Sequence, residues 1–390
     1  MNSKLLLFFS GFILIYGLIH YYIGLRGWQF INECFFNPRI LRYWIILMVF
    51  LFISYPLGRL LAPVLPHYMG QIIIVLGSYW MAFMYYLLII LITIDAVRLL
   101  DKWTGFLPAV IKNAPATAGW AVIVIVTAIV SYGAWNAHHP VVRDYELTLN
   151  KKSSSLDTLH VAAVSDIHLG WINGLKQTRL MTDMINGLNP DIVLLPGDII
   201  DEGIDLSTEE KIPELLRTLR PALGSYAIMG NHEYISGNAD MVELYLEKAG
   251  VTVLRDEWKE FSGFYLIGRD DNSRQYYGGS PRQDLDTIME GIDKDKLPVI
   301  LLDHQPSDLQ TAEQAGIDLQ LSGHTHRGQI WPNNYITGAI FEEDWGYLRK
   351  NKLHLIVSCG YGTWGPPIRV GNRPEILNIR IKFEPSATDL

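Results

Sequence analysis

Four long apolar stretches dominate the first third of the chain. They cover residues 4–24, 43–65, 71–97 and 117–135, and each is nearly free of charged side chains. A helix needs about 20 apolar residues to cross a bilayer core that is roughly 30 Å thick. Since a lipid-exposed backbone must satisfy its own hydrogen bonds, the pattern predicts an all-α bundle of four transmembrane helices over residues 1–135.

The pattern changes after residue 135. Residues 136–157 contain Pro140 and a polar stretch of lysines and serines, which is typical of a linker, although 145–149 alternates like an edge strand. From residue 158 on, short apolar strands recur, with helical patterns between the first of them. This alternation predicts an α/β domain over residues 158–390, with its strands buried between layers of helices. The expected strands are 160–165, 191–196, 225–229, 264–268, 298–302, 319–322, 353–358 and 376–383, and the expected helices are 176–188, 208–219 and 239–249.

Composition and charge follow the same division. The chain is 49% hydrophobic and 18% charged, which excludes a disordered protein. Residues 1–135 carry eight Lys and Arg against three Asp and Glu, whereas the remainder carries 24 against 37, so the net charge of -8 combines +5 with -13. The two cysteines, Cys34 and Cys359, lie far apart in the sequence and exclude a disulfide framework.

The distribution of Lys and Arg indicates how the spans are oriented. The loops at 25–42 and 98–116 carry six positive side chains, against three to five on the opposite side of the expected bundle. The positive-inside rule places the richer loops in the cytoplasm. We therefore expect a multi-pass protein of the cell membrane whose large C-terminal domain is extracytoplasmic.

Polar side chains suited to metal binding follow the ends of five expected strands. They are Asp166 and His168, then Asp198 and Asp201, then Asn231 and His232, then His304, and finally His324 and His326. Each cluster alone is more typical of a loop, but five clusters in the same position relative to a strand predict one shared site. Glycines at 197, 230 and 323 permit sharp turns there. Asp, Asn and neutral His suit Mn, Fe or Zn, and no thiolate accompanies them.

Taken together, these residues resemble the signature of the calcineurin-like metallophosphoesterase superfamily. That signature is Asp-x-His, Gly-Asp-x-x-Asp, Gly-Asn-His-Asp/Glu, a lone His and Gly-His-x-His, and all five blocks occur in this order within residues 158–383. The chain is most similar to bacterial members with a membrane-anchored catalytic domain, some of which act on the pyrophosphate of lipid-linked sugar nucleotides. The resemblance implies a four-layer αββα sandwich with two divalent metal ions.

The resemblance also implies a role for each matched residue. Asp166, His168 and His326 would hold the first metal, Asn231, His304 and His324 the second, and Asp198 would bridge the two. His232 would touch the scissile phosphate and assist the leaving oxygen, while Asp201 would orient His232. Arg327 and Arg369 are weaker candidates for contact with a substrate phosphate, because surface or ion-pair roles are commoner for arginine. Trp331, Trp345 and Trp364 are candidates for an apolar mouth, although packing is the usual role of tryptophan.

The expected chemistry also follows from charge. A phosphate ester is an anion that repels nucleophiles, and two dications about 4 Å apart would bind its oxygens and lower the pKa of a bridging water enough for in-line attack. A histidine with an ordinary pKa near 6.5 suits protonation of the leaving alkoxide. We expect a binuclear metal-dependent hydrolase of phosphate esters or pyrophosphates.

Three functions remain open from the sequence. The favoured one is a membrane phosphoesterase for a lipid-linked or envelope substrate, because the spans hold the site near the bilayer. The second is a membrane-anchored phosphodiesterase for soluble nucleotides, and the third is a non-catalytic sensor or scaffold, against which the complete set of ligand residues argues. No basic patch is present that would follow a nucleic-acid backbone. The expected partners are therefore a phosphate substrate and membrane lipids.

Overall fold

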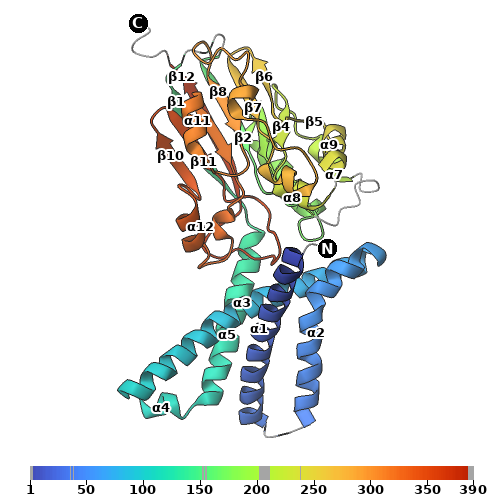
Figure 1. Cartoon of the computed structure of the whole chain (residues 1–390), viewed down its shortest axis with the longest axis vertical. Helices are drawn as coiled ribbons and strands as arrows, with labels where there is room; N and C mark the ends of the chain where they lie inside the picture. The colour runs from blue at the N-terminus through green and yellow to red at the C-terminus, as the bar shows by residue number, and fades with distance from the viewer. Residues whose placement is uncertain are drawn as a thin grey trace. The chain divides into compact units, whose positions relative to one another are not determined.

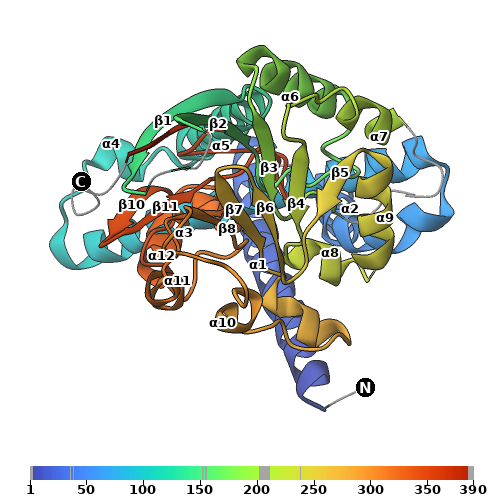
Figure 2. The ribbon, with the colours of Figure 1, turned by 90° about the horizontal axis from the view of Figure 1, so that it is seen from above.

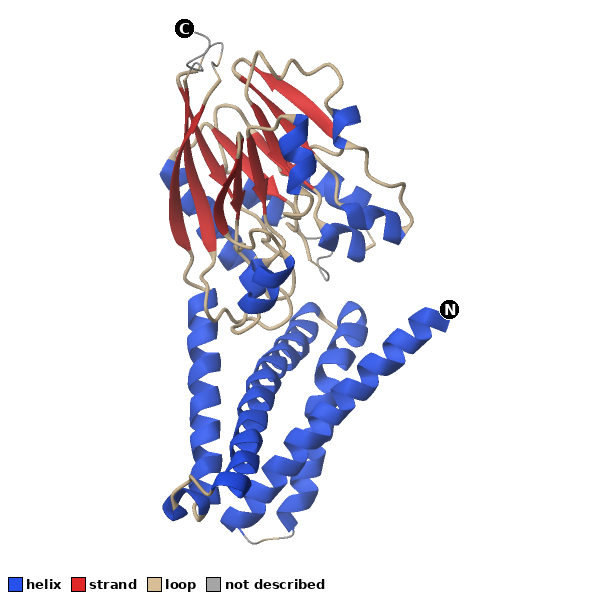
Figure 3. Ribbon diagram, turned by 60° about the vertical axis from the view of Figure 1, so that its left-hand side comes forward, coloured by secondary structure: helices blue, strands red, loops and turns tan. Residues whose placement is uncertain are grey.

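The computed structural model describes residues 3–35, 37, 39–151, 153, 156–201, 211–237 and 239–384. The chain divides into two compact units. The first unit comprises Met1–Ala134 with Gly365–Pro367, and the second comprises Trp135–Trp364 with Ile368–Leu390. The first unit is helical and the second combines strands with helices (Figure 3). This confirms the expected fold class.

Long helices make up the first unit (Figure 1). Its elements are α1 (Ser3–Phe35), α2 (Arg39–Leu61), the 3-10 turn η1 (Ala62–Val64), α3 (His67–Thr104), α4 (Ala109–Lys112) and α5 (Pro115–Ala137). Among the described residues, α2, α3 and α5 are long and apolar enough to cross a membrane, by length and composition. The expected span at 4–24 lies in α1, which is not among them, so four crossings remain a prediction.

Close backbone approach and indole hydrogen bonds hold these helices together. A Cβ on Gly77 of α3 would lie 2.7 Å from the backbone of Tyr55 in α2, and small residues permit this kind of approach between apolar helices. The indole Nε1 of Trp44 donates to the carbonyl of Gly24 at 2.8 Å. These contacts tie α2 to both of its neighbours, α1 and α3.

The second unit contains two six-stranded sheets. The first has the order β1-β12-β2-β3-β4-β5 and the second the order β10-β11-β9-β8-β7-β6. The strands are β1 (Val141–Leu149), β2 (Thr158–Ala163), β3 (Ile192–Pro196), β4 (Ser225–Ile228), β5 (Val251–Val253), β6 (Glu257–Phe261), β7 (Phe264–Gly268), β8 (Val299–Leu302), β9 (Leu319–Ser322), β10 (Gly346–Lys350), β11 (Leu353–Val357) and β12 (Glu375–Phe383). The helices are α6 (Leu175–Leu188), α7 (Lys211–Leu216), α8 (Asn231–Ile235), α9 (Ala239–Lys248), α10 (Leu285–Ile288), α11 (Leu309–Ala315) and α12 (Asn334–Ile340), with 3-10 turns η2 (Asn272–Tyr277) and η3 (His326–Gly328).

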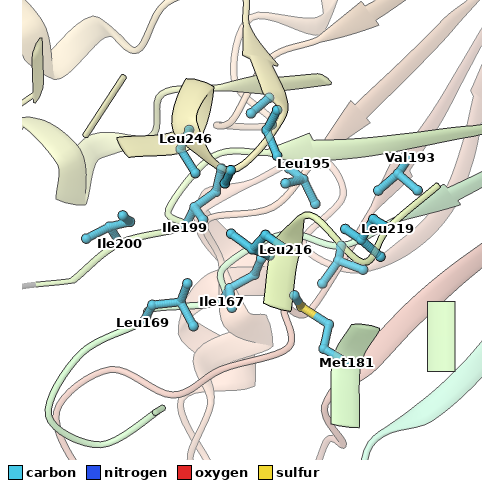
Figure 4. Close-up of a cluster of buried hydrophobic side chains, with 14 of the residues drawn as sticks. Ile167, Leu169, Met181, Val193, Leu195, Ile199, Ile200, Leu216, Leu219 and Leu246 are labelled. Atoms are coloured by element: carbon cyan, nitrogen blue, oxygen red, sulfur yellow. The ribbon is translucent and has the colours of Figure 1, made fainter. Parts of the chain in front are cut away.

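Strand β3 shows how the layers are built. Successive side chains of a strand point to opposite faces, so Ile192 and Leu194 join the core between the two sheets, while Val193 and Leu195 join the core beneath α6, α7 and α9 (Figure 4). All four are completely buried, and burial of each such side chain contributes about 1.5–3 kcal/mol. A strand with two buried faces reads as a continuous apolar run.

The second sheet is covered in the same way on its outer face. Ile267 and Val299 pack with side chains of α10 and α11, for example Ala312. Viewed from above, the two sheets lie between these helical layers (Figure 2). The arrangement is the four-layer αββα sandwich that the family resemblance implied.

The sequence located the buried strands better than the peripheral ones. The eight expected strands correspond to β2, β3, β4, β7, β8, β9, β11 and β12, each within two residues of the expected bounds. Strands β5, β6 and β10 were not expected, because they are short or half-exposed. The sheet also begins earlier than residue 158, since β1 lies within the segment interpreted as a linker and pairs in parallel with β12 at the sheet edge. The expected helix 208–219 begins among residues 202–210, which lie outside the described residues, and its described part is α7.

Candidate metal centre

The loops that follow the parallel strands carry the polar clusters to one site. Strands β2, β3 and β4 run parallel in the first sheet, as do β8 and β9 in the second. Side chains that follow parallel strands meet at the carboxyl edge of a sheet. Three groups of ligand atoms converge there. Within each group, the ligand atoms lie within 4.8 Å of one another. The groups are Asp166 with His168 and His326, Asp198 with His304 and His324, and His168 with Asp198 and His232.

The first group brings two imidazole nitrogens and a carboxylate together. His168 Nε2 lies 3.0 Å from His326 Nε2, and His326 Nε2 lies 3.4 Å from Asp166 Oδ1. Burial lowers the pKa of His168 to about 4 and that of His326 well below its ordinary value. Both rings are therefore neutral at pH 7, so each has a nitrogen lone pair for a cation.

The amide oxygen of Asn231 lies beside both histidines of the second group. Asn231 Oδ1 lies 2.7 Å from His324 Nδ1 and 3.2 Å from His304 Nε2. His304 Nε2 in turn lies 3.1 Å from Asp198 Oδ2. On its other side, His304 Nδ1 lies 2.8 Å from the carbonyl of Pro196. Since a carbonyl only accepts, Nδ1 carries the proton and donates, which leaves Nε2 directed at the site.

Asp198 connects the two groups. Its Oδ2 lies 3.1 Å from His304 Nε2 and 3.8 Å from His168 Nε2. Burial would raise the pKa of Asp198, but the nearby ring of His304 outweighs burial and holds the pKa well below its usual range. In the same coupled pair, burial lowers the pKa of His304 while Asp198 raises it well above its usual value. Protons and cations therefore compete for this set of donors.

The charge balance of the site fits divalent cations. Asp166 and Asp198 are almost completely buried, and burial raises the pKa of Asp166 to about 6. In the part of the chain that the structure describes, neither carboxylate forms an ion pair with Lys or Arg. Buried carboxylates are normally paired or bound to metal. Oxygen and imidazole donors without thiolate suit Mn, Fe or Zn.

The backbone of the ligand loops is held in conformations that L-residues rarely adopt. The φ angles of Asp166, His168, Asp198, His324 and His326 are all positive, between 48° and 70°. A positive φ is uncommon outside glycine and persists only where the surroundings enforce it, often at a functional site. Five of the seven expected ligands share this feature.

Two glycines allow the ligand loops to approach one another. A Cβ on Gly230 would lie 2.2 Å from Asp198 Oδ1, and one on Gly323 would lie 2.2 Å from Asp166 Oδ2. Distances this short are steric clashes. Two of the three glycines that the sequence associated with sharp turns are therefore also required by contact with the carboxylates.

His232 lies beside both groups and is oriented by Asp201. Its Nδ1 is 3.1 Å from Asp201 Oδ1, and its backbone N–H donates to Asp198 Oδ1 at 2.9 Å. Burial lowers the pKa of His232, but the hydrogen bond to Asp201 and the charge of Asp198 outweigh burial and raise the pKa to about 9. The imidazole stacks edge-on against His168, with 4.5 Å between ring centroids.

Glu233 is a buried residue of the site for which the sequence gave no role. Its carboxylate accepts four backbone N–H groups, from Asp198, Ile199, Ile200 and Gly230. It thereby fixes the loop that carries Asp198 to the loop that carries His232. Burial and the charge of Asp198 raise the pKa of Glu233 to about 7. Its place as the last residue of Gly-Asn-His-Glu was the only signal in the sequence.

The two expected arginines differ in their surroundings. Arg369 has no exposed surface; its Nη2 donates to the carbonyl of Gly362 and its Nη1 donates to Asn372 Oδ1 at 2.8 Å. Nη2 also lies 3.2 Å from His326 Nδ1. Complete burial behind His326 does not suit direct contact with a substrate, and favours a role in positioning that ring.

Arg327 is only partly buried and follows His326 directly in the chain. Its guanidinium carbon lies 4.0 Å from the ring centroid of Trp345. Such cation–π stacking holds a guanidinium without consuming its N–H donors. Contact between Arg327 and a substrate phosphate remains a prediction.

Comparisons with known proteins agree with the site. A family model described as Calcineurin-like phosphoesterase matches residues 159–328. An uncharacterized metallophosphoesterase of Aquifex aeolicus is 35% identical over 228 residues, which cover 57% of this chain and 85% of that protein. A transmembrane protein with metallophosphoesterase domain is 32% identical in Danio rerio over 66% of this chain, and 33% identical in Bos taurus over 68% of it. This chain spans 61% and 63% of the length of these two relatives.

Proposed function

We propose that this chain, which belongs to the calcineurin-like metallophosphoesterase family, hydrolyses a phosphate ester or a pyrophosphate with two divalent metal ions held by its α/β unit. The family and the converging ligand residues support a metal-dependent phosphoester hydrolase. The proposal of hydrolysis with two metal ions rests mainly on the position of His232, which is paired with Asp201 and lies beside both ligand groups.

The ligand groups suggest how the metals would be held. Asp166, His168 and His326 would hold one cation, and Asn231, His304 and His324 the other, with Asp198 shared between them. Bound divalent cations would neutralise charge on the phosphoryl oxygens and activate water as a nucleophile. Mn, Fe and Zn all suit this donor set. Glu233 would hold the loop that carries Asp198 against the loop that carries His232.

The protein's own proton donor would be His232. The hydrogen bond between its Nδ1 and Asp201 leaves Nε2 to deliver a proton to the leaving oxygen, and a pKa of about 9 keeps the ring protonated at neutral pH. Positive charge on this ring would also stabilise the phosphoryl group as it is transferred. Arg327, next to His326, is our candidate for a further phosphate contact.

An exposed indole beside His232 supports a substrate with a large apolar or planar group. Trp364 is 52% exposed, and its ring centroid is 6.2 Å from that of His232. The backbone of Trp364 is held by Gln329, whose side chain exchanges two hydrogen bonds with it, each 3.1 Å long. A fixed, exposed aromatic ring offers contact area at little entropic cost.

We propose a lipid-linked or envelope phosphate as the substrate of a multi-pass membrane enzyme. The three apolar helices support membrane insertion, as do the relatives named as transmembrane proteins with a metallophosphoesterase domain. The excess of Lys and Arg in loops 25–42 and 98–116 favours an extracytoplasmic α/β unit. Soluble nucleotides are the main competing class of substrate, since a nucleoside also suits Trp364.

Hydrolysis by the full-length, Mn-loaded protein should distinguish these substrates. We expect kcat/KM to be highest for diacyl sugar nucleotides or phospholipid head groups, lower for cyclic nucleotides and measurable for aryl phosphates. Cyclic nucleotides as the best substrates would overturn the lipid assignment and leave the phosphoesterase intact. Failure to hydrolyse any of the four classes, in protein that binds two metal ions, would instead favour the sensor.

Replacement of Asp201 by Asn should shift the pH dependence of turnover. The acid form of His232 is required, so activity falls as the pH rises through its pKa. Loss of the Asp201 charge lowers that pKa and should move the alkaline limb of the kcat profile to lower pH by about one unit or more. Asp183→Asn, which removes an exposed carboxylate from α6, is the control. An unchanged alkaline limb in Asp201→Asn, with metal content retained, would contradict the pairing.

A further inference from the structure

A cavity of about 560 Å³ lies among the helices of the first unit. It is bordered by one face of each of α1, α2, α3 and α5. On α3, the lining residues include Leu87, Leu91, Ile94 and Arg98, which follow the three- and four-residue spacing of a single helical face. The volume falls within the range of small-molecule sites, about 300–1,000 Å³.

The lining is apolar along most of its length and charged at one end. Arg26, Glu33 and Arg98 line the cavity near the C-terminal ends of α1 and α3. From Arg98 back to Leu87, helix α3 rises by about 16 Å. This is about the depth of one leaflet, since the whole apolar core is roughly 30 Å thick. The cavity thus has the profile of one leaflet, with a charged head region and an apolar tail region.

Arg26 is already paired at this end of the cavity, whereas Arg98 and Glu33 are exposed. Arg26 pairs with Asp95 and donates to Gln29, yet its Nε is buried without a hydrogen-bond partner. In the portion of the chain described here, Arg98 and Glu33 form no ion pair. Both side chains are exposed at the charged end of the cavity, where they are available to a lipid head group. The guanidinium of Arg98 and the carboxylate of Glu33 complement a head group with a phosphate and an amine.

We propose that this cavity binds one diacyl phospholipid with an amino head group, of the phosphatidylethanolamine class. Arg98 holds its phosphate, Glu33 faces its ammonium group, and an acyl chain lies along Leu87 and Leu91. Arginine suits this task because its N–H donors match phosphate oxygens. The lipid is a bound partner and not a substrate, so the inference does not rest on the proposed function.

The full-length protein in detergent tests the proposal by native mass spectrometry with added phosphatidylethanolamine. We expect one retained lipid per chain, and at least tenfold weaker retention for Arg98→Gln and for Ala118→Trp, which fills the cavity from α5. The matched controls are Arg42→Gln, at the same end of the bundle, and Ala121→Trp, on another face of α5; neither residue lines the cavity. Both controls should bind like the unchanged protein.

The head group is tested by comparing lipids with the same acyl chains. Phosphatidylethanolamine should exceed phosphatidylglycerol in the unchanged protein, and Glu33→Gln should remove that preference. Diacylglycerol should bind at least tenfold more weakly than either. Equal binding of diacylglycerol, or identical behaviour of Arg98→Gln and Arg42→Gln, would overturn the proposal in favour of an apolar groove without head-group recognition.

Discussion

Replacement of Asp198 by Asn is expected to remove metal from both ligand groups and to abolish turnover. Asp198 is the residue whose carboxylate approaches both groups, with Oδ2 3.1 Å from His304 Nε2 and 3.8 Å from His168 Nε2. An amide has the same shape but lacks the negative charge that would hold two dications. We expect kcat/KM to fall by on the order of 10³-fold or more, which corresponds to about 4 kcal/mol of transition-state stabilisation.

The decisive measurement on Asp198→Asn is the metal content per chain, followed by titration with Mn. The fold should persist, because an amide oxygen can still accept the N–H of His232 that Asp198 Oδ1 accepts at 2.9 Å. Circular dichroism checks this, and Asp183→Asn again serves as the control for loss of a carboxylate. Two tightly bound ions in Asp198→Asn would show that this residue does not bridge them, whatever happens to activity.

The predictability of the fold depended on how many faces of an element are buried. Strand β3 was located within one residue, because both of its faces enter apolar cores and its sequence is apolar throughout. Strand β6 was missed because three of its five residues, Glu257, Lys259 and Glu260, are polar and exposed, so nothing distinguishes it from a loop. Strand β1 was placed in a linker, because its only local signal was the alternation at 145–149 and its parallel partner lies more than 200 residues away.

The sequence predicted the residues of the candidate site whose type indicates their chemistry. It did not predict the residues whose role depends on where the fold places them. The Asp, Asn and His residues are candidate ligands by type and by their place after strands. Glu233 and Arg369 act through buried hydrogen bonds that depend on how loops fold back, which spacing does not encode. Arg369 in particular suggested a phosphate contact by its charge, whereas its complete burial assigns it to the support of His326.

Replacement of His232 by Ala should separate metal binding from proton transfer. The imidazole is not needed to complete either ligand group, so both metals should stay bound. Turnover of an alkyl phosphate, whose leaving oxygen must be protonated, should fall about 10²- to 10⁴-fold, the usual contribution of a general acid. An activated aryl phosphate leaves without that proton, and its hydrolysis should fall by less than about tenfold.

The ratio of the two rate losses is what identifies the role of His232. If the ring only stabilised charge on the phosphoryl group, both substrates would slow equally, because that charge is common to both transition states. Loss of metal would instead make His232 a ligand, as its place within 4.8 Å of His168 and Asp198 ligand atoms permits. His160→Ala, in β2 and bonded to Asn378, controls for the removal of an imidazole elsewhere. A larger rate loss for the alkyl than for the aryl phosphate, with both metals retained, therefore supports His232 as the proton donor. Equal rate losses, or loss of metal, would exclude that role.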